Sequence, residues 1–317
     1  MTHLSRRAAL AGAAALSIAP RLVRAADKVT KLTIGYQKNG DLLVLKEQDT
    51  LSKRLAQQGV ALDWVEFQSG PPLLEALNAG SVDFGATGDT PPIFAQAAGA
   101  NLVYVGYVAV PGASNAVVVP KDSPIKQLTD LKGKKVAFTK GSSANNVIVQ
   151  VLNHAGLSYS DITPVYLQPP DAAAAFQQGS IDAWSIWDPF YAIAVMKFGA
   201  RVLTDGVGIA PSNSFFLANK DYAAKAPQVL SVVVEELDHA SQWEATHQDD
   251  QAVLFSKATG VELAVEKVAA ARGNYGIKFL TPEVVTQQQG IADTFYKLGL
   301  IPKKIEVSSI VWTPPKS

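Results

Sequence analysis

The sequence predicts an α/β protein of two similar units, each a mainly parallel sheet flanked by helices. The chain has 317 residues, more than a single hydrophobic core usually holds. Strand patterns alternate with helical patterns along most of it, which favours parallel sheets. A short phrase also occurs twice, 99 positions apart, as Gly80 to Asp83 and Gly179 to Asp182. Each copy leads to a further aspartate, Asp89 or Asp188, so the second unit repeats the first.

The repeat extends to the order of the predicted elements. The first unit is expected to contain strands over 31–37, 62–67, 82–86 and 102–108, and helices over 44–58, 71–79 and 89–99. The second is expected to contain strands over 135–139, 164–167 and 181–186, and helices over 145–154 and 170–178. A strand over 215–218 follows, and then helices over 226–248, 249–257, 263–272 and 282–298. This last part contains no third copy of the phrase.

We expect the last third of the chain to return to the first unit and cover it. Lobe 1 then consists of residues 26–115 and 214–317, and lobe 2 of residues 116–213. The chain would cross between the lobes near Asn115–Val117 and Asn213–Phe215, and the hinge should lie there. Small ligands favour the cleft between two such units.

Residues 1–25 are typical of a bacterial export signal peptide. Arg6 and Arg7 precede a small apolar run over 8–19, and small residues around Ala25 suit cleavage. The run is too short to span a bilayer. The arginine pair fits twin-arginine export, and the general export route stays open beside it.

Composition excludes several classes of function. Apolar residues make up 48% of the chain and charged residues 18%, as in a soluble globular protein. The signal carries four arginines and no acid, which leaves 24 basic and 28 acidic residues and argues against nucleic-acid binding. The absence of cysteine removes disulfides, thiolate catalysis, thiolate metal sites and a lipid anchor. We therefore expect a monomer in the periplasm that is not a lipoprotein.

Polar loops follow the predicted strands and are the candidate ligand site. They are Gln37–Asp41, Thr87–Asp89, Gly141–Ser143 and Trp187–Pro189. Ligands collect outside the carboxyl ends of parallel strands, and several of these loops lead straight into a helix. A helix start offers free N–H groups and a positive dipole end, which suit an anionic oxygen. Hydroxyl, amide and indole donors dominate there, with Lys140 as the one nearby cation, which suits an anion that stays ionised.

Each candidate also has a structural interpretation. Asp89 and Asp188 are good helix N-caps beside prolines, so capping competes with ligand contact. The turn Gly141–Ser143 with Asn145 fits a cap and a tight turn equally well. Trp187 fits either a core position or a flat apolar wall with an N–H donor.

Catalytic groups are missing from these loops. The histidines, His3, His154, His239 and His247, all lie elsewhere, so Ser142 or Ser143 would lack its usual base as a nucleophile. We therefore expect a binding protein and not an enzyme, with no cofactor and no metal.

Taken together, the sequence resembles the periplasmic substrate-binding proteins of ATP-driven (ABC) importers, in the group that binds aliphatic sulfonates, taurine and nitrate, and most closely those for aliphatic sulfonates. The stretches that carry the resemblance are Ile34–Lys38, Trp64–Phe67, Gly80–Asp89, Pro91–Gly99, Leu102–Gly106, Val136–Phe138, Lys140–Ser143, Ala174–Pro189, Leu300–Lys304 and Trp312.

The resemblance implies a type II two-lobed periplasmic-binding fold that closes by hinge motion on an alkanesulfonate and presents it to a membrane permease for sulfur acquisition. The head-group contacts that it implies are Gln37, Thr87, Gly88, Asp89, Ser142, Ser143 and Trp187, with Asn145 and Asp188 as further candidates. Taurine or nitrate binding on the same fold is the alternative. A second alternative is an enzyme on the same fold, since some desulfinases and thiamine-pyrimidine synthases resemble these binding proteins.

Overall fold

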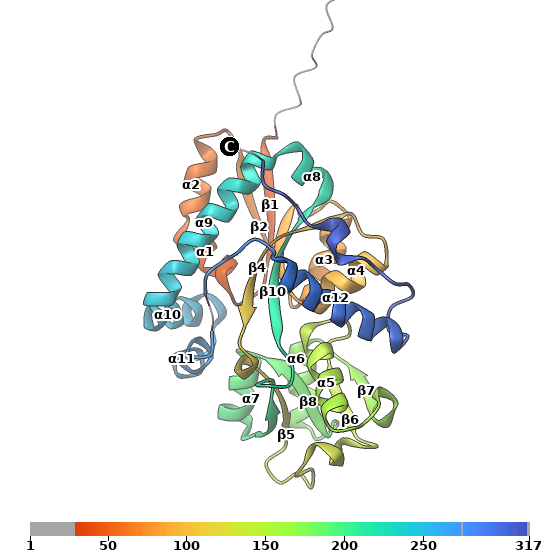
Figure 1. Cartoon of the computed structure of the whole chain (residues 1–317). Helices are drawn as coiled ribbons and strands as arrows, with labels where there is room; N and C mark the ends of the chain where they lie inside the picture. The colour runs from red at the N-terminus through yellow and green to blue at the C-terminus, as the bar shows by residue number, and fades with distance from the viewer. Residues whose placement is uncertain (1–28, 274, 316–317) are drawn as a thin grey trace, which may run out of the picture.

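The computed structural model describes residues 29–273 and 275–315, which form two α/β lobes (Figure 1). The predicted signal peptide, residues 1–25, lies outside the described residues. Among the helices that the structure describes, none combines the length and the apolar character needed to cross a bilayer.

The sheet of lobe 1 has five strands in the order β2-β1-β3-β10-β4. These are β1 (Lys31–Tyr36), β2 (Ala61–Glu66), β3 (Phe84–Gly88), β4 (Leu102–Val110) and β10 (Ser212–Asn219). Strand β1 pairs parallel with β2 and β3, whereas β10 runs antiparallel to both of its neighbours, β3 and β4. Four strands therefore point one way, and the strand that comes from far along the chain points the other.

The sheet of lobe 2 has the same design, in the order β7-β6-β8-β5-β9. Its strands are β5 (Asn115–Val119), β6 (Lys135–Phe138), β7 (Thr163–Tyr166), β8 (Ala183–Trp187) and β9 (Arg201–Asp205). Strand β6 pairs parallel with β7 and β8, and β5 runs antiparallel to β8 and β9. The chain changes sheet between β4 and β5 and again between β9 and β10. The lobe boundaries at 115/116 and 213/214 stay a prediction.

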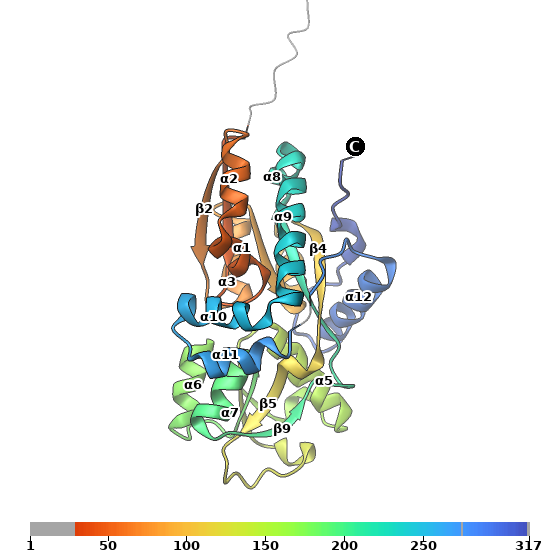
Figure 2. The same ribbon diagram turned by 90° about the vertical axis from the view of Figure 1, so that its left-hand side faces the viewer.

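Helices cover both faces of each sheet. Lobe 1 carries α1 (Asp41–Gln48), α2 (Thr50–Ala56), α3 (Gly70–Asn78), α4 (Thr90–Ala97), α8 (Lys220–Lys225), α9 (Pro227–Thr246), α10 (Gln248–Thr259), α11 (Leu263–Ala270) and α12 (Pro282–Lys297). Lobe 2 carries α5 (Ser143–His154), α6 (Pro169–Gln177) and α7 (Phe190–Phe198). Short 3-10 helices lie at Gly112–Ser114, Leu128–Leu131, Tyr159–Asp161 and Val307–Ile310. Figure 2 shows α10 and α11 at the junction between the lobes, where α11 packs against α7.

One expectation about a single element was wrong, and one strand was not predicted. The helix predicted over 44–58 is two helices, because Asp49 between them adopts a left-handed conformation with a φ of 55°. No glycine or proline marks this break in the sequence. The crossing point predicted near Asn115–Val117 is the start of β5, a strand of the second sheet that was not itself predicted.

The two crossing strands hold the core of their lobes. In β10, Phe215 and Leu217 pack into one apolar cluster, while Phe216 and Ala218 pack into the cluster on the other face of the sheet. The β5 residues 116–119 alternate in the same way between the two clusters of lobe 2. Alternate side chains of a strand point to opposite faces, so a strand covered on both sides is apolar throughout. Full burial of each large apolar side chain contributes about 1.5–3 kcal/mol, which fixes both crossing strands firmly.

The duplicated phrase corresponds to a structural repeat. Adding 99 to the bounds of α3 and β3 gives the bounds of α6 and β8. Asp83 and Asp182 make equivalent bonds: Asp83 accepts from the N–H of Thr33 at 2.8 Å, and Asp182 accepts from the N–H of Lys135 at 2.7 Å. Both carboxylates thus tie the start of β3 or β8 to the first strand of the parallel set, which is a structural role.

The glycines of the phrase end helices. Gly80 and Gly179 follow α3 and α6 by two residues and have φ values of 74° and 67°. This left-handed conformation is the usual one just beyond a helix C-terminus, and glycine adopts it at little cost.

Candidate functional site

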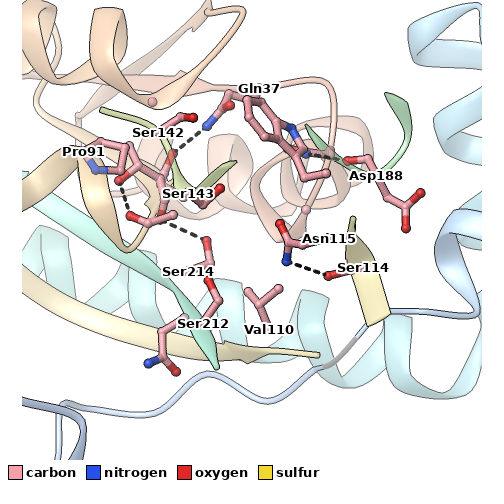
Figure 3. A pocket seen from close by; sticks show the side chains of 18 of the residues that line it. Gln37, Pro91, Val110, Ser114, Asn115, Ser142, Ser143, Asp188, Ser212 and Ser214 are labelled. Carbon is pink, nitrogen blue, oxygen red and sulfur yellow. Dashed lines mark hydrogen bonds between the residues drawn. The ribbon is translucent and has the colours of Figure 1, made fainter. Parts of the chain in front are cut away.

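A cavity of about 170 Å³ lies between the lobes, at the carboxyl ends of the strands (Figure 3). Seven of the nine residues predicted from the sequence line it: Gln37, Thr87, Gly88, Ser142, Ser143, Trp187 and Asp188. The other two, Asp89 and Asn145, do not line it and are 0% and 1% exposed. The strand-exit loops of both lobes therefore meet at one place.

The turn before α5 is shaped by residues behind the cavity. Gly141 is left-handed, with a φ of 71°, and its N–H donates to Asn145 Oδ1 at 3.1 Å. The Ser142 hydroxyl donates to the carbonyl of Thr139 at 2.7 Å. Asn145 thus holds the turn in shape from inside the lobe, and Ser142 leads the chain into the helix.

The start of α5 presents donors toward the cavity. Among the described residues, the N–H groups of Ser143 and Ala144 and the hydroxyl of Ser143 have no hydrogen-bond partner. The N-terminus of a helix carries partial positive charge together with such unpaired N–H groups. This end of the cavity is therefore suited to an anionic oxygen.

Lobe 1 approaches this helix start very closely at Gly88. A methyl group added to Gly88 would lie 2.8 Å from Ser143 Cβ, closer than carbon atoms approach each other without repulsion. The neighbouring Thr87 carbonyl accepts from the Ser214 hydroxyl at 3.1 Å, and Gln37 Nε2 donates to the Ala86 carbonyl at 3.1 Å. Glycine at position 88 thus allows the two lobes to meet beside the anion-suited end.

Asp89 joins the lobes from a buried position. Its carboxylate accepts from Asn146 Nδ2 of lobe 2 at 3.0 Å, from the Ser212 hydroxyl of β10 at 3.0 Å and from the Thr90 hydroxyl at 2.7 Å. No side-chain cap bond to α4 accompanies these contacts in the described chain. Burial raises the pKa of Asp89 to about 6, against the lowering effect of these donors. The carboxylate is fully occupied by protein groups.

Asp188 has two partners and also lines the cavity. Its Oδ1 accepts from the N–H of Ala192, in the first turn of α7, at 3.1 Å, although the N-cap residue of this helix is Pro189 and not Asp188 as predicted. Its Oδ2 lies 3.2 Å from Arg272 Nη1 in an ion pair without hydrogen-bond alignment. Burial raises the pKa of Asp188 to about 7 although the charge of Arg272 opposes this. The peptide bond between Asp188 and Pro189 is cis.

Further contacts join the lobes on either side of the cavity. Ser69, just before α3, donates from its hydroxyl to Gln168 Oε1, just before α6, at 2.8 Å. Asn39 Nδ2 donates to the Asp188 carbonyl at 3.3 Å. Lys197 of α7 forms an ion pair with Glu262, which precedes α11. The lobes are therefore in contact around the cavity.

The cavity lining contains neutral donors and two acids. No lysine, arginine or histidine occurs among the described residues that line it. Lys140, which precedes the turn Gly141–Ser143, instead places its ammonium 5.4 Å from the centre of the Tyr166 ring, and Lys38 pairs with Glu66 at 3.5 Å. Over the described ranges, no three His, Asp or Glu residues are placed to hold a metal ion.

Sequence reasoning missed part of the lining. Asn39 and Asp41 of the predicted loop Gln37–Asp41 line the cavity, and the missed polar residues are Ser114, Asn115, Ser212, Asn213 and Ser214. These lie where the chain passes between the lobes. The run of polar residues over 212–214, just before an apolar strand, is the signal that could have indicated them.

The structure has two α/β lobes that the chain joins at two places, and a polar cavity suited to an anion lies between them. These features define the class of two-lobed solute-binding proteins. The chain belongs to the NMT1/THI5-like family, whose profile matches residues 55–251.

Relatives support this membership. The chain is 43% identical over 307 residues to an aliphatic sulfonates-binding protein of Escherichia coli K12, which covers 96% of each chain. The alkanesulfonate-binding protein SsuA of Xanthomonas axonopodis pv. citri, solved bound to MOPS, matches with a TM-score of 0.84 and 40% identity over 89% of this chain and 98% of its own. The periplasmic aliphatic sulphonate binding protein SsuA of Escherichia coli matches with a TM-score of 0.80 and 43% identity over 90% and 98%. The predicted resemblance and the two-lobed fold are confirmed.

Proposed function

We propose that this protein is a periplasmic solute-binding protein that captures an aliphatic sulfonate between its lobes and delivers it to an ABC importer for sulfur acquisition. The observation that carries the proposal is the unpaired donor group at the start of α5, made by the N–H groups of Ser143 and Ala144 and the Ser143 hydroxyl. Of these residues, Ser143 lines the cavity, and the described lining contains no cationic side chain. The names of the similar proteins, which bind sulfonates, support the same ligand class.

A sulfonate matches this donor set chemically. It stays ionised at any physiological pH, so neutral donors suffice to hold it and no counter-charge is needed to keep a proton off. Its three oxygens can accept from Ser143, from the α5 amides and from donors of lobe 1 at the same time. Hydrogen bonds to a charged group contribute about 1.5–3 kcal/mol each, so a few of them produce useful affinity.

The predicted contacts divide into two roles within this proposal. Gln37, Thr87, Gly88, Ser142, Ser143 and Trp187 surround the head group, and Asp188 lies at the far end of the cavity. Asp89 and Asn145 act from behind it, by joining the lobes and by shaping the turn before α5. Both are positioning residues.

Binding and release of the ligand then depend on the two segments that connect the lobes. The lobes are linked through the segments between β4 and β5 and between β9 and β10, so rotation there opens the cleft. Closure brings Gly88 of lobe 1 against Ser143 of lobe 2 and replaces water around the sulfonate with donors from both sides. The closed form is what a permease recognises. The function is binding without bond cleavage, by an exported single chain.

Calorimetric titration tests the proposal. We expect the mature chain to bind ethanesulfonate and propanesulfonate, with sulfate and nitrate binding more weakly. Ser143→Ala should weaken binding by about 10- to 100-fold, because it removes one bond to a charged group. Ser180→Ala, on the exposed part of the repeat, is the matched control and should bind as the wild type does. No heat with any sulfonate would overturn the proposal, and so would turnover of a sulfonate by the purified protein.

A further inference from the structure

Residues 260–273, which contain α11 and which we call the α11 segment, reach from lobe 1 to lobe 2 at the junction between the lobes (Figure 2). Helix α11 packs against α10 of its own lobe and against α7 of lobe 2. Two ion pairs accompany this packing: Lys197 pairs with Glu262, and Arg272 Nη1 lies 3.2 Å from Asp188 Oδ2. The α11 segment therefore connects the lobes in addition to the two places where the chain passes between them.

The two ion pairs differ in their exposure to water. The side chains of Lys197 and Glu262 are 38% and 66% exposed, whereas those of Arg272 and Asp188 are 19% and 10% exposed. Exposed pairs contribute little, because water screens them and holding two long side chains costs entropy. In a pair that is largely removed from water, losing one partner leaves a costly unpaired charge. Of the two pairs, that of Arg272 with Asp188 can therefore influence whether the lobes stay together.

Asp188 is held in place by atoms other than its Oδ2. Its N–H donates to the carbonyl of Ser114, in the connection between β4 and β5, at 3.1 Å. Its carbonyl accepts from Asn39 Nδ2 at 3.3 Å, and its Oδ1 accepts from the N–H of Ala192 at 3.1 Å. Three hydrogen bonds thus fix the position of this residue, and its Oδ2 is left to meet the α11 segment.

The guanidinium of Arg272 also lies against a second group of lobe 2. Its central carbon is 4.0 Å from the centre of the Tyr191 ring, which is within the range of a cation–π contact. A planar guanidinium stacks on an aromatic ring, whereas a lysine ammonium acts only as a point charge. Arg272 thus makes two contacts with lobe 2, and separation of the lobes breaks both.

The ion pair of Arg272 with Asp188 is not a complete hydrogen bond. Charge-assisted N–H···O bonds are about 2.7–2.9 Å long, so the distance of 3.2 Å leaves room for a closer approach. Arg272 Nη1 and Asp188 Oδ2 are both buried, and within the part of the chain that the structure describes neither makes a hydrogen bond. A small further approach of the lobes would align the two groups, so the pair gains strength as the cleft closes.

A static role in the fold explains only part of this arrangement. An acid just before α7 favours the helix dipole and accepts from the first turn, which accounts for Asp188 Oδ1. That role gives no reason for a cation from the other lobe that meets Oδ2. Asp188 also lines the ligand cavity, whereas Arg272 does not. The contact therefore connects the wall of the cavity with the interface between the lobes.

We propose that Arg272 is a clasp for the closed form: its bond to Asp188 is completed when the lobes close on the ligand, and it slows reopening and release. The inference rests on the proposed function and adds what sets the lifetime of the ligand-bound form. The ligand enters while the lobes are apart and the pair is separated, so the clasp acts on release and not on capture. Arg272 is a positioning residue, because it acts through the lobes and not on the ligand.

Release kinetics test the inference. The association and dissociation rate constants of propanesulfonate are measured by stopped-flow tryptophan fluorescence, since Trp187 lines the cavity. The measurements are made at pH 8, above the Asp188 pKa of about 7, so that the carboxyl is charged. In Arg272→Gln we expect the dissociation rate constant to rise about 10-fold, because the closed form then holds an unpaired carboxylate. The association rate constant should stay within about threefold of the wild type.

A double-mutant cycle assigns the effect to the clasp. In an Asp188→Asn background, Arg272→Gln should change the dissociation rate constant by less than about threefold, since no carboxylate is left unpaired. Arg272→Lys keeps the charge without the planar face over Tyr191, and its rate constant should fall between those of the wild type and Arg272→Gln. Lys267→Gln is the matched control on the same segment. It loses an exposed pair with Asp249, also of lobe 1, and both rate constants should stay unchanged.

The outcomes separate this inference from the proposed function. An unchanged dissociation rate constant in Arg272→Gln would overturn the clasp and leave sulfonate binding standing. A rise of the same size in the Asp188→Asn background would overturn the pair as its cause. A change confined to the association rate constant would also overturn the clasp, since Arg272 would then act on capture. No binding of propanesulfonate to the wild type would overturn the function and the inference together.

Discussion

Asp89 and Asp188 occupy equivalent positions of the repeat, each directly after the corresponding strand, β3 or β8, yet their surroundings differ completely. Asp89 is fully buried, and three donors, one of them from the other lobe, saturate its carboxylate. Asp188 accepts from the N–H of Ala192 with one oxygen, faces Arg272 with the other and lines the cavity between the lobes.

The comparison shows that the repeat determines where each aspartate lies in its lobe. The residues packed around it determine what its carboxylate binds. Asn146 and Ser212 make Asp89 a link between the lobes, whereas Asp188 pairs with Arg272 and lines the cavity. The same holds one residue earlier, where Gly88 permits a close approach and its counterpart Trp187 provides a wall of the cavity.

The largest expected effect is on the pH dependence of stability. Both native pKa values, about 6 for Asp89 and about 7 for Asp188, lie above the 3.8 of the free side chain. The native state therefore binds these protons more tightly than the unfolded state, and the stability that each contributes is full below about pH 4 and is lost as the pH rises through its native pKa. The loss is on the order of 4 kcal/mol for Asp188 and 3 kcal/mol for Asp89.

Asparagine variants should separate the two residues. The free energy of unfolding of Asp89→Asn should rise relative to that of the wild type as the pH rises from about 4 to about 6. For Asp188→Asn, this relative rise should continue up to about pH 7. Urea denaturation across this range measures both, with the exposed Asp171→Asn as control. Curves that run parallel to the wild type would show that the two carboxyls are not perturbed.

The next effect concerns Gly88. In Gly88→Ala, the new methyl group would lie 2.8 Å from Ser143 Cβ across the cleft, so the lobes could not meet as they do. Overpacking costs about 1–3 kcal/mol, so we expect propanesulfonate binding to weaken by up to about 100-fold with little change in thermal stability. Gly290→Ala is the control, because a methyl group there meets no atom. Unchanged affinity in Gly88→Ala would mean that closure does not bring these two residues together.

The smallest effect concerns Ser69 and Gln168, the equivalent residues that precede α3 and α6. A double-mutant cycle with Ser69→Ala and Gln168→Ala should give a coupling free energy of about 0.5–1.5 kcal/mol for their hydrogen bond. The coupling should be larger with a sulfonate bound than without it, since closure favours the contact. A coupling that is equal in both states would indicate a contact unrelated to closure.

The parts that sequence could predict are local ones. Strand exits such as Thr87–Gly88 and Ser142–Ser143 were recognisable because parallel strands gather their carboxyl ends at one edge, and both line the cavity. The role of Asp89 in joining the lobes could not be recognised from the sequence. Its partners Asn146 and Ser212 come from distant parts of the chain and leave no local pattern. The ion pair of Asp188 with Arg272 was missed for the same reason, because Arg272 comes from far along the chain.

The contact between Ser69 and Gln168 has one more consequence. Two copies of a unit related by a two-fold rotation touch through identical positions only on the axis itself, as in the isologous interface of a dimer. Ser69 and Gln168 hold equivalent positions of the repeat, 99 residues apart, so their bond joins the two lobes through corresponding points, as a contact in such an interface does. Closing the cleft is thus the association of two half-molecules already tethered to each other. Because the two lobes are tethered, their effective concentration is high, and a few contacts together with one small anion are enough to hold the closed form.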